Sequence, residues 1–223
     1  MSRLSFDPLL VPVESIAGEA PLMAERLSSA WLRERFANPP EWFPEGSDEQ
    51  RARQAGRTPS PAAVLIPIVL RSDGPTLLFT QRTADLRNHG GQVSFPGGRV
   101  EADDRSVIDT ALRETEEEIG LPRSQIEVIG SLPEYFTGTG YRVTPVAALV
   151  QPPLSLTPNP GEVAEIFEVP FAFLMNGMNH ERRTIVLESE FGSRTFYTMP
   201  YQRFFIWGAT AGMLRNLFHF LRA

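Results

Sequence analysis

Short apolar runs separated by turn-forming residues predict most of the strands in this chain. A nearly continuous apolar run covers residues 62–70, and a second run over residues 76–82 follows a turn at residues 72–75. Runs of this kind are typical of buried strands, so the pair is expected to form a hairpin. Pro67 lies inside the first run and predicts an edge position or a bulge, since proline cannot donate a ladder hydrogen bond. Further strands are predicted at residues 126–132, 142–150, 185–190 and 194–198.

Apolar residues spaced three or four positions apart predict helices, because this spacing places them on one helical face. Strands mixed with a few such helices predict an α+β fold in which helices flank a sheet. Proline and polar residues dominate residues 37–62 and predict a linker. Residues 1–60 are therefore expected to form an N-terminal extension with one helix, and residues 61–223 the main domain. The predicted helices cover residues 21–36, 104–119, 171–176 and 206–221.

The composition excludes several kinds of chemistry. The chain of 223 residues has no cysteine, which excludes disulfides, thiolate zinc sites and cysteine nucleophiles. Its three histidines lack metal-ligand spacing, and its net charge of -6 provides no basic field that would attract nucleic acid or an anionic membrane. We therefore expect a cytoplasmic protein that binds neither nucleic acid nor membranes. Local groups or metal ions are expected to hold any phosphate ligand.

The helix predicted from Asp104 carries acidic residues on one side and apolar residues on the other. Glu114, Glu117 and Glu118 are three and four positions apart, so their carboxylates lie close together on the helix surface. Without a cation, each like-charge pair should destabilise the helix by roughly 0.2–0.5 kcal/mol. Mg²⁺ and Mn²⁺ prefer oxygen ligands and would reverse this repulsion. Asp103 or Asp104 is expected to cap the start of the helix. The apolar side consists of Ile108, Ala111, Leu112, Thr115 and Ile119.

A run of glutamates is usually a solvated helix face, and this interpretation competes with a metal site. The segment upstream favours the metal site, because the Phe-Pro-Gly-Gly turn at residues 95–98 lets the backbone approach a ligand closely. Arg113 lies four positions before Glu117 and is expected to orient its carboxylate by a charge-assisted hydrogen bond. Together these residues predict a site for divalent cations and a diphosphate.

At these residues the sequence resembles the Nudix hydrolases. Residues 113–121, Arg-Glu-Thr-Glu-Glu-Glu-Ile-Gly-Leu, match the second half of the family signature except at Thr115, where the family usually has an aliphatic residue. The first half differs, since Asp104 replaces the usual glutamate and the stretch from Gly98 to Arg113 is one residue longer. This longer, aspartate-containing spacing is similar to that of the coenzyme A diphosphatase subgroup.

Two further segments resemble the same subgroup. Residues 78–98 contain its pattern of leucine, threonine, arginine and a later glycine before Phe-Pro-Gly-Gly, with Phe79 and Thr83 where leucine and serine or alanine are commoner. Residues 201–211 resemble its C-terminal helix, so the resemblance covers residues 61–221. The resemblance implies a Nudix-type α/β/α sandwich with a mixed sheet.

The resemblance also implies roles for individual residues. Glu114 and Glu118 would bind Mg²⁺ or Mn²⁺, with Glu117 joining them or holding a second ion, and the Gly97 carbonyl would be a further ligand. Arg113 would brace the glutamates. The catalytic base of many Nudix enzymes lies outside the signature, and three acidic residues are candidates for it, each with a structural or solvated role as its alternative. These candidates are Glu162, Glu165 and Glu134.

Coenzyme A carries a 3′-phosphate, so a site that recognises it needs local positive charge. Arg82, Arg87 and His89 precede the glycine turn and are candidates for substrate binding, although ordinary surface charge also explains them. The loop at residues 136–141 combines aromatic residues with glycines and is a candidate cover for adenine or pantetheine. Turn formation alone also explains its glycines.

Three functions are consistent with these residues. The preferred hypothesis is metal-dependent hydrolysis of the diphosphate of coenzyme A or its derivatives to 4′-phosphopantetheine and adenosine 3′,5′-bisphosphate. The alternatives are a Nudix hydrolase of another nucleoside diphosphate derivative, such as ADP-ribose or a dinucleotide, and a non-catalytic Nudix-fold binding module. The complete set of three glutamates argues against the binding module. The apolar C-terminal helix is expected to pack on the sheet, and any remaining aromatic surface would favour a homodimer.

Overall fold

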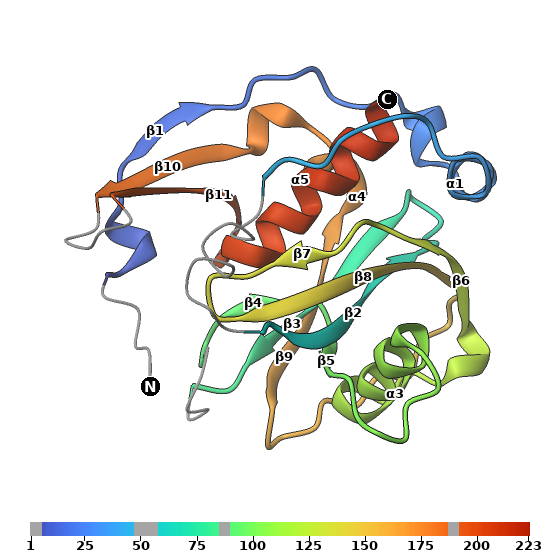
Figure 1. Ribbon diagram of the computed structural model, residues 1–223. Helices are drawn as coiled ribbons and strands as arrows, with labels where there is room; N and C mark the ends of the chain where they lie inside the picture. Colours follow the sequence, from blue (N-terminus) through green and yellow to red (C-terminus); the bar gives the residue numbers. More distant parts are fainter. Residues whose placement is uncertain (1–5, 47–57, 85–89, 187–191) are drawn as a thin grey trace.

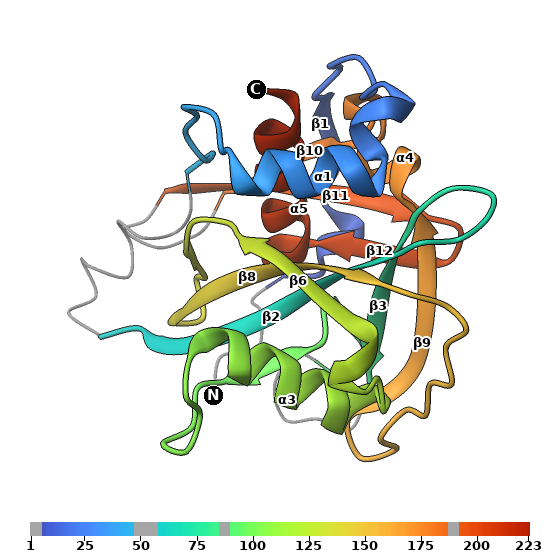
Figure 2. The same cartoon turned by 90° about the vertical axis from the view of Figure 1, so that its right-hand side faces the viewer.

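The computed structural model describes residues 6–46, 58–84, 90–186 and 192–223. Helix α5 (Gly208–Arg222) lies between two sheets, and helix α3 (Val107–Ile119) covers the opposite face of the larger sheet (Figure 1, Figure 2). The layers therefore follow the order small sheet, α5, large sheet, α3. This arrangement confirms the predicted α/β/α sandwich with a mixed sheet and adds a second sheet outside it. No described helix is long and apolar enough to cross a membrane.

In the described residues the larger sheet has eight strands. They are β2 (Ser60–Val69), β3 (Thr76–Arg82), β4 (Val93–Ser94), β5 (Gly97–Arg99), β6 (Ile126–Ser131), β7 (Tyr135–Phe136), β8 (Tyr141–Val150) and β9 (Val163–Pro170). The main order is β4–β3–β2–β8–β6, with β5 paired to β2, β7 to β8 and β9 to β3. β2 and β8 are parallel and the other pairs are antiparallel, so the sheet is mixed.

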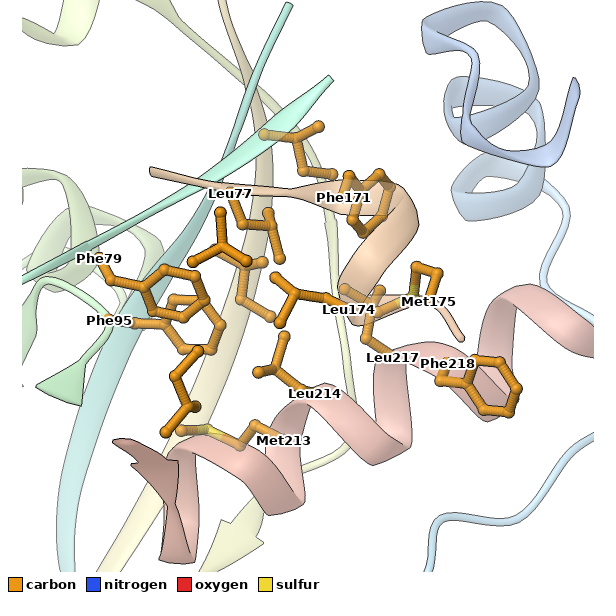
Figure 3. Close-up of a cluster of buried hydrophobic side chains, with 14 of the residues drawn as sticks. Leu77, Phe79, Phe95, Phe171, Leu174, Met175, Met213, Leu214, Leu217 and Phe218 are labelled. Atoms are coloured by element: carbon orange, nitrogen blue, oxygen red, sulfur yellow. The ribbon is translucent and has the colours of Figure 1, made fainter. Parts of the chain in front are cut away.

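Strand β2 is buried on both faces, and its side chains alternate between the two helices. Ile66 and Ile68 belong to the main core together with Leu214 of α5, whereas Leu65 packs in a separate cluster with Ala111 of α3. This alternation follows from the two-residue repeat of a strand and explains why the run is apolar at nearly every position. Figure 3 shows the core between α5 and the large sheet.

Pro67 does not lie in an edge strand, because β2 lies between β3 and β8. The predicted edge position is therefore wrong. On one side, Pro67 pairs in register with Ala148 of β8. On the other side, β5 pairs with residues 62–64 and β3 with residues 68–69, so Pro67 falls in the gap between these two partners. The missing N–H therefore interrupts no ladder there.

The smaller sheet combines the N-terminal segment with the C-terminal part of the chain. Its strands follow the order β1–β10–β11–β12 and are all antiparallel. They are β1 (Val13–Ile16), β10 (Glu181–Val186), β11 (Ser193–Tyr201) and β12 (Phe204–Trp207). The strand predicted at 185–190 starts earlier, and residues 187–191 lie outside the described part. β12 pairs with β11 over the first residues of the helix predicted at 206–221, so α5 begins at Gly208 instead.

The helix predicted at residues 21–36 is divided into η2 (Ala24–Leu27) and α1 (Ser29–Ala37). Ser28 is extended, with ψ 146°, and its side chain accepts a hydrogen bond from the Trp31 N–H, so it ends one element and caps the other. Leu27 and Leu32 are buried in the main core. The helix predicted at 171–176 ends two residues earlier, as α4. The remaining elements are η1 (Pro8–Leu10), η3 (Arg123–Gln125), α4 (Phe171–Leu174) and η4 (Gly177–Asn179).

Arg215 of α5 is buried and joins α5 to the N-terminal segment. Its guanidinium donates to Glu19 at 2.8 Å, to Glu45 at 2.6 Å and to Nδ1 of His180 at 3.0 Å. Because Nδ1 accepts this bond, Nε2 carries the proton that is donated to the Leu174 carbonyl at 2.7 Å. Burial lowers the pKa of His180 to about 4, and the hydrogen bonds from Arg215 lower the pKa of Glu19 to about 2. Buried charge thus attaches the N-terminal segment to the rest of the protein.

Candidate active site

The glycine turn that precedes α3 lies against the centre of the large sheet. β5 pairs with β2, with Gly97 opposite Val64 and Gly98 opposite Ala63. Gly97 has a φ of 155°, and a Cβ atom there would lie 2.3 Å from the carbonyl oxygen of Ala63. Glycine alone fits this approach, so the turn brings backbone groups next to the side chains of α3.

The start of α3 differs from the prediction. Ser106 caps the helix by accepting a hydrogen bond from the Asp109 N–H, so the predicted caps Asp103 and Asp104 are wrong. Asp104 instead accepts hydrogen bonds from Arg113 at 2.8 and 3.0 Å and from the Thr110 hydroxyl at 2.8 Å. The aspartate of the lengthened loop therefore holds an arginine in place.

Arg113 connects the loop to the glutamates. Besides Asp104, it contacts Glu114 and Glu117, each at 3.0 Å, and the predicted contact with Glu117 is confirmed. The hydrogen bonds from Arg113 hold the pKa of Asp104 well below its usual range. Three carboxylates thus fix one guanidinium, which in turn positions Glu114 and Glu117, the two glutamates that follow it in the helix.

Glu118 is the most buried of the three glutamates, with 3% of its side chain exposed. It accepts a hydrogen bond from the Gly97 N–H at 3.2 Å, and a guanidinium nitrogen of Arg82 lies 3.6 Å from its other oxygen. Burial nevertheless raises the pKa of Glu118 to about 8, because these two partners offset only part of the desolvation. A cation that displaced the proton would stabilise the charged form.

Glu114 lies directly beside the glycine turn. A Cβ atom at Gly98 would lie 2.4 Å from the carboxylate carbon of Glu114 and 2.4 Å from one of its oxygens. The Glu114 side chain is 15% exposed, and burial raises its pKa. The absence of a side chain at Gly98 therefore creates the space that this carboxylate occupies.

Glu117 and Ile108 lie nearer to solvent. The Glu117 side chain is 57% exposed, and Ile108 is 38% exposed, so the predicted place of Ile108 on the buried face is wrong. Ala111, Thr115 and Ile119 are buried as predicted.

Within the described ranges, no three His, Cys, Asp or Glu residues form a group that could hold a metal ion as they stand. Arg113 holds Glu117 in its outward position, because its guanidinium contacts the Glu117 carboxylate at 3.0 Å.

A cavity of about 600 Å³, here called the carboxylate cavity, brings these side chains together. The predicted loop at residues 136–141 contributes Thr137, Gly138, Thr139 and Tyr141 to its wall. Two predicted substrate-binding residues, Arg87 and His89, lie outside the described residues. The predicted site residues on its wall are Arg82, Gly97, Arg113, Glu114, Glu117, Glu118 and Glu162.

The three candidates for the catalytic base occupy different environments. Glu162 lines the carboxylate cavity, whereas Glu165 and Glu134 are absent from its wall and form ion pairs with arginines. Glu162 directly precedes β9, a strand that the sequence analysis missed. Its charge contributes to the raised pKa of both Glu114 and Glu118. This placement favours Glu162 over the other two candidates.

Several cavity residues escaped the sequence analysis. Tyr135, Arg194 and Trp207 come from β7, β11 and β12 and line the cavity near the start of α5. On another part of the wall, Arg99 donates to the Tyr141 hydroxyl at 2.6 Å. Pairing between distant strands brings these residues together, and local periodicity carries no signal for such pairing. The consecutive apolar residues before Gly208 were a signal for β12, but they were assigned to the helix.

The chain is similar in sequence to one protein family. The NUDIX domain model matches residues 59–188. Proteins named Uncharacterized Nudix hydrolase NudL, from Escherichia coli O7:K1 and Shigella boydii serotype 18, are 46% identical to this chain over 156 residues. Each match covers 70% of this chain and 80% of the relative. Residues 59–188, which the family model matches, include the glycine turn and all of α3.

Solved structures with similar chains have lower identity. A Nudix hydrolase from M. smegmatis, RenU, is 27% identical, with a TM-score of 0.44 over 50% of this chain and 71% of its own. The NUDIX domain of Shewanella oneidensis NrtR, complexed with ADP ribose, is 18% identical, with a TM-score of 0.42 over 65% of this chain and 84% of its own.

Proposed function

Because the chain belongs to the NUDIX domain family and is a hydrolase of diphosphate bonds in nucleoside diphosphate derivatives, we propose that its substrate is coenzyme A or a coenzyme A derivative. The loop before α3 carries this proposal. The loop is one residue longer than the general signature, and its Asp104 binds Arg113 through two hydrogen bonds. The same longer, aspartate-containing spacing is found in the coenzyme A diphosphatase subgroup that the sequence resembles, and the contact gives the aspartate a physical role.

The residues at the glycine turn fit a divalent cation, and Nudix hydrolases generally use such ions. Carboxylate and carbonyl oxygens are the donors that Mg²⁺ and Mn²⁺ prefer. We assign Glu114, Glu118 and the Gly97 carbonyl as ligands, and Glu117 would join them by rotating its exposed side chain. The steric fit between Gly98 and the Glu114 carboxylate supports this assignment. When bound, the ion would offset phosphate charge and lower the pKa of a coordinated water.

Glu162 is the proposed general base. It would take a proton from the attacking water as the water oxygen bonds to one phosphorus and the bond from that phosphorus to the bridging oxygen breaks. Arg113 positions Glu114, and Arg82, which lies 3.6 Å from Glu118, faces the place proposed for the diphosphate. The products would be 4′-phosphopantetheine and adenosine 3′,5′-bisphosphate.

A substrate panel tests this proposal. The protein is incubated with coenzyme A, ADP-ribose, NADH and a diadenosine polyphosphate, with and without Mg²⁺ or Mn²⁺, and the products are identified by mass. We expect metal-dependent cleavage of coenzyme A at the highest kcat/KM. A higher kcat/KM for ADP-ribose would overturn the substrate assignment and leave the alternative hydrolase. A complete lack of metal-dependent turnover would favour the binding module.

The Glu118→Gln variant tests the metal assignment separately. Glutamine keeps the size of the side chain and removes its charge, so the fold should persist while the rate falls by about 10²- to 10³-fold. Circular dichroism checks the fold. Full activity in this variant would show that α3 is not the metal site.

We also propose that the protein is a cytoplasmic homodimer. Exposed apolar side chains on the N-terminal segment, including Leu10 and Val13, support a second copy as partner. Light scattering after size exclusion tests the assembly. A mass near the 24.9 kDa of one chain would contradict it.

A further inference from the structure

Glu162 is held from both sides by backbone hydrogen bonds. Its N–H donates to the Asn159 carbonyl at 3.0 Å, and its carbonyl accepts from the Thr83 N–H at 2.9 Å. Thr83 directly follows Arg82, whose guanidinium lies 3.6 Å from the Glu118 carboxylate. The backbone of the proposed general base is therefore tied to the end of β3 that presents Arg82 to the carboxylate cavity.

The segment before Glu162 is also attached to the end of α3. The Asn159 N–H donates to the Glu118 carbonyl at 2.8 Å, and the Thr157 N–H donates to the Ile119 carbonyl at 2.9 Å. Carbonyls in the last turn of a helix have no partner within the helix, so these two bonds satisfy groups that would otherwise need water. Asn159 thus connects the backbone of a proposed metal ligand, Glu118, directly to the backbone of the proposed base.

Residues 159–162 form a turn whose sequence suits its shape. Asparagine and proline are favoured at the first two positions of such a turn, and Asn159 and Pro160 occupy them. The Asn159 side-chain oxygen accepts a hydrogen bond from the Gly161 N–H at 3.1 Å, and the Asn159 carbonyl also accepts from the Val163 N–H at 2.8 Å. The side chain therefore fixes the turn at the residue directly before Glu162.

A β-bulge at the start of β9 determines which way Glu162 faces. The register with β3 shifts between residues 81 and 82, and Ala164 has no opposite residue there. Val163 and Ile166 pack in the same hydrophobic cluster, although residues three apart in a regular strand point to opposite faces. The extra residue therefore reverses the alternation for Val163 and Glu162. It turns Val163 into the core beside α3 and leaves Glu162 on the wall of the carboxylate cavity.

We propose that Asn159 is a positioning residue of the reaction, whose side chain holds the turn that places the Glu162 carboxylate relative to the ion bound by Glu118. The inference rests on the proposed function, in which Glu162 is the general base. A base must lie within hydrogen-bond reach of the attacking water, and a misplacement of about 1 Å costs about 10²-fold in rate. Asn159 does not line the cavity, so it acts through Glu162 and not by contact with the substrate.

Steady-state kinetics of the full chain test this inference with saturating Mg²⁺ and the diphosphate substrate that is cleaved best. Asn159→Ala removes the side-chain oxygen but keeps the backbone bonds of residue 159. We expect kcat to fall about 10-fold, because the turn is loosened and not lost, while KM changes by less than about twofold. Asn159→Asp keeps an acceptor for the Gly161 N–H and should retain kcat within about threefold of the wild type. Circular dichroism checks the fold of both variants.

Asn176→Ala is the matched control. The Asn176 side chain accepts a hydrogen bond from the Met178 N–H at 3.0 Å in the same two-residue pattern, and Asn176 does not line the carboxylate cavity. This variant should keep wild-type kcat. Wild-type kcat in Asn159→Ala would overturn the inference. A loss that appears only in KM, or one that Asn159→Asp shares in full, would also overturn it.

A second change at Glu162 shows whether Asn159 acts through this residue. Glu162→Gln removes the base, so Asn159→Ala should cause almost no further loss of kcat in this background, although it lowers kcat when it is the only change. If the two losses multiply, Asn159 acts independently of Glu162 and the inference is wrong.

The same variants separate this inference from the proposed function. If coenzyme A is not the preferred substrate but the double variant behaves as expected on another diphosphate, the substrate assignment fails and the role of Asn159 stands. If Glu162→Gln lowers kcat and Asn159→Ala does not, the inference fails alone. Wild-type kcat in Glu162→Gln would refute the general base and the role of Asn159 together, and so would a complete lack of turnover.

Discussion

Replacement of Gly98 with alanine tests the metal site without altering a carboxylate. The added Cβ atom would lie 2.4 Å from the carboxylate carbon of Glu114. Nonbonded carbon atoms are most stable about 3.5–4.0 Å apart, so the carboxylate must move by roughly 1 Å. The movement takes it away from the turn that carries the Gly97 carbonyl.

Gly98→Ala should reduce the catalytic rate more than it reduces the stability of the fold. A misplacement of about 1 Å costs about 10²-fold in rate, which corresponds to about 2.7 kcal/mol of transition-state stabilisation. The fold should tolerate the change, because Gly98 is not among the residues with positive φ and the obstructing atoms end a flexible side chain. We expect the free energy of unfolding to change by about 1 kcal/mol or less.

Two measurements check this prediction. The first is kcat/KM for the diphosphate substrate as a function of Mg²⁺ concentration, and the second is urea denaturation without metal. Gly46→Ala is the matched control for metal affinity, because a Cβ atom there would meet nothing within 4 Å. Wild-type metal affinity and rate in Gly98→Ala would refute the assignment of Glu114 as a ligand. A large loss of stability would show that its carboxylate cannot move aside.

The raised pKa of Glu118, about 8, predicts that a metal ion must displace a proton, so Mn²⁺ affinity should fall up to about tenfold per pH unit below pH 8. Calorimetry between pH 6 and 8 measures this, and a constant affinity would contradict it. Because this pKa in the folded protein lies above the ordinary glutamate value of 4.5, the metal-free protein should lose stability as pH rises from 4.5 through 8, and Glu118→Gln should lose less in urea denaturation. Asp104→Asn should loosen Arg113 and lower kcat/KM by about 10- to 100-fold without unfolding the protein; an unchanged kcat/KM would show that the contact is dispensable. The pKa of His180, lowered to about 4, predicts stability that is present above pH 6.5 and is lost as pH falls through 4, by roughly 3 kcal/mol. The urea midpoint of the wild type should therefore depend more steeply on pH in this range than that of His180→Gln. If the two midpoints depend equally on pH, protonation of His180 is not the cause of the acid destabilisation.

The glutamate site was predictable because its parts are close in sequence. The glycine turn, the loop aspartate and the three glutamates all lie between residues 95 and 118, and helical geometry alone places Glu114 and Glu118 on neighbouring turns. The parallel strands were also predictable, since burial on both faces leaves a continuous apolar run in β2.

Competition between local partners explains the predictions that were wrong. Aspartate is a favourable N-cap residue, but the Asp104 carboxylate is bound by Arg113. Ser106 therefore caps α3 instead. Residues 206 and 207 fit a helical period, but pairing with β11 makes them part of a strand. Arg194 gave no signal at all, because its place in the cavity depends on a sheet whose strands are distant in sequence.

The ion cluster around Arg215 determines how far the chain can be shortened. The family match begins at residue 59, but the carboxylates of Glu19 and Glu45 that neutralise Arg215 precede it. Removal of the partners of a buried charge typically costs about 3–5 kcal/mol, a large share of the 5–15 kcal/mol that is typical of a folded protein. The shortest chain that folds should therefore begin before residue 59, where the family match begins. Its N-terminal limit is set by the need to keep the carboxylates that neutralise the buried charge of Arg215.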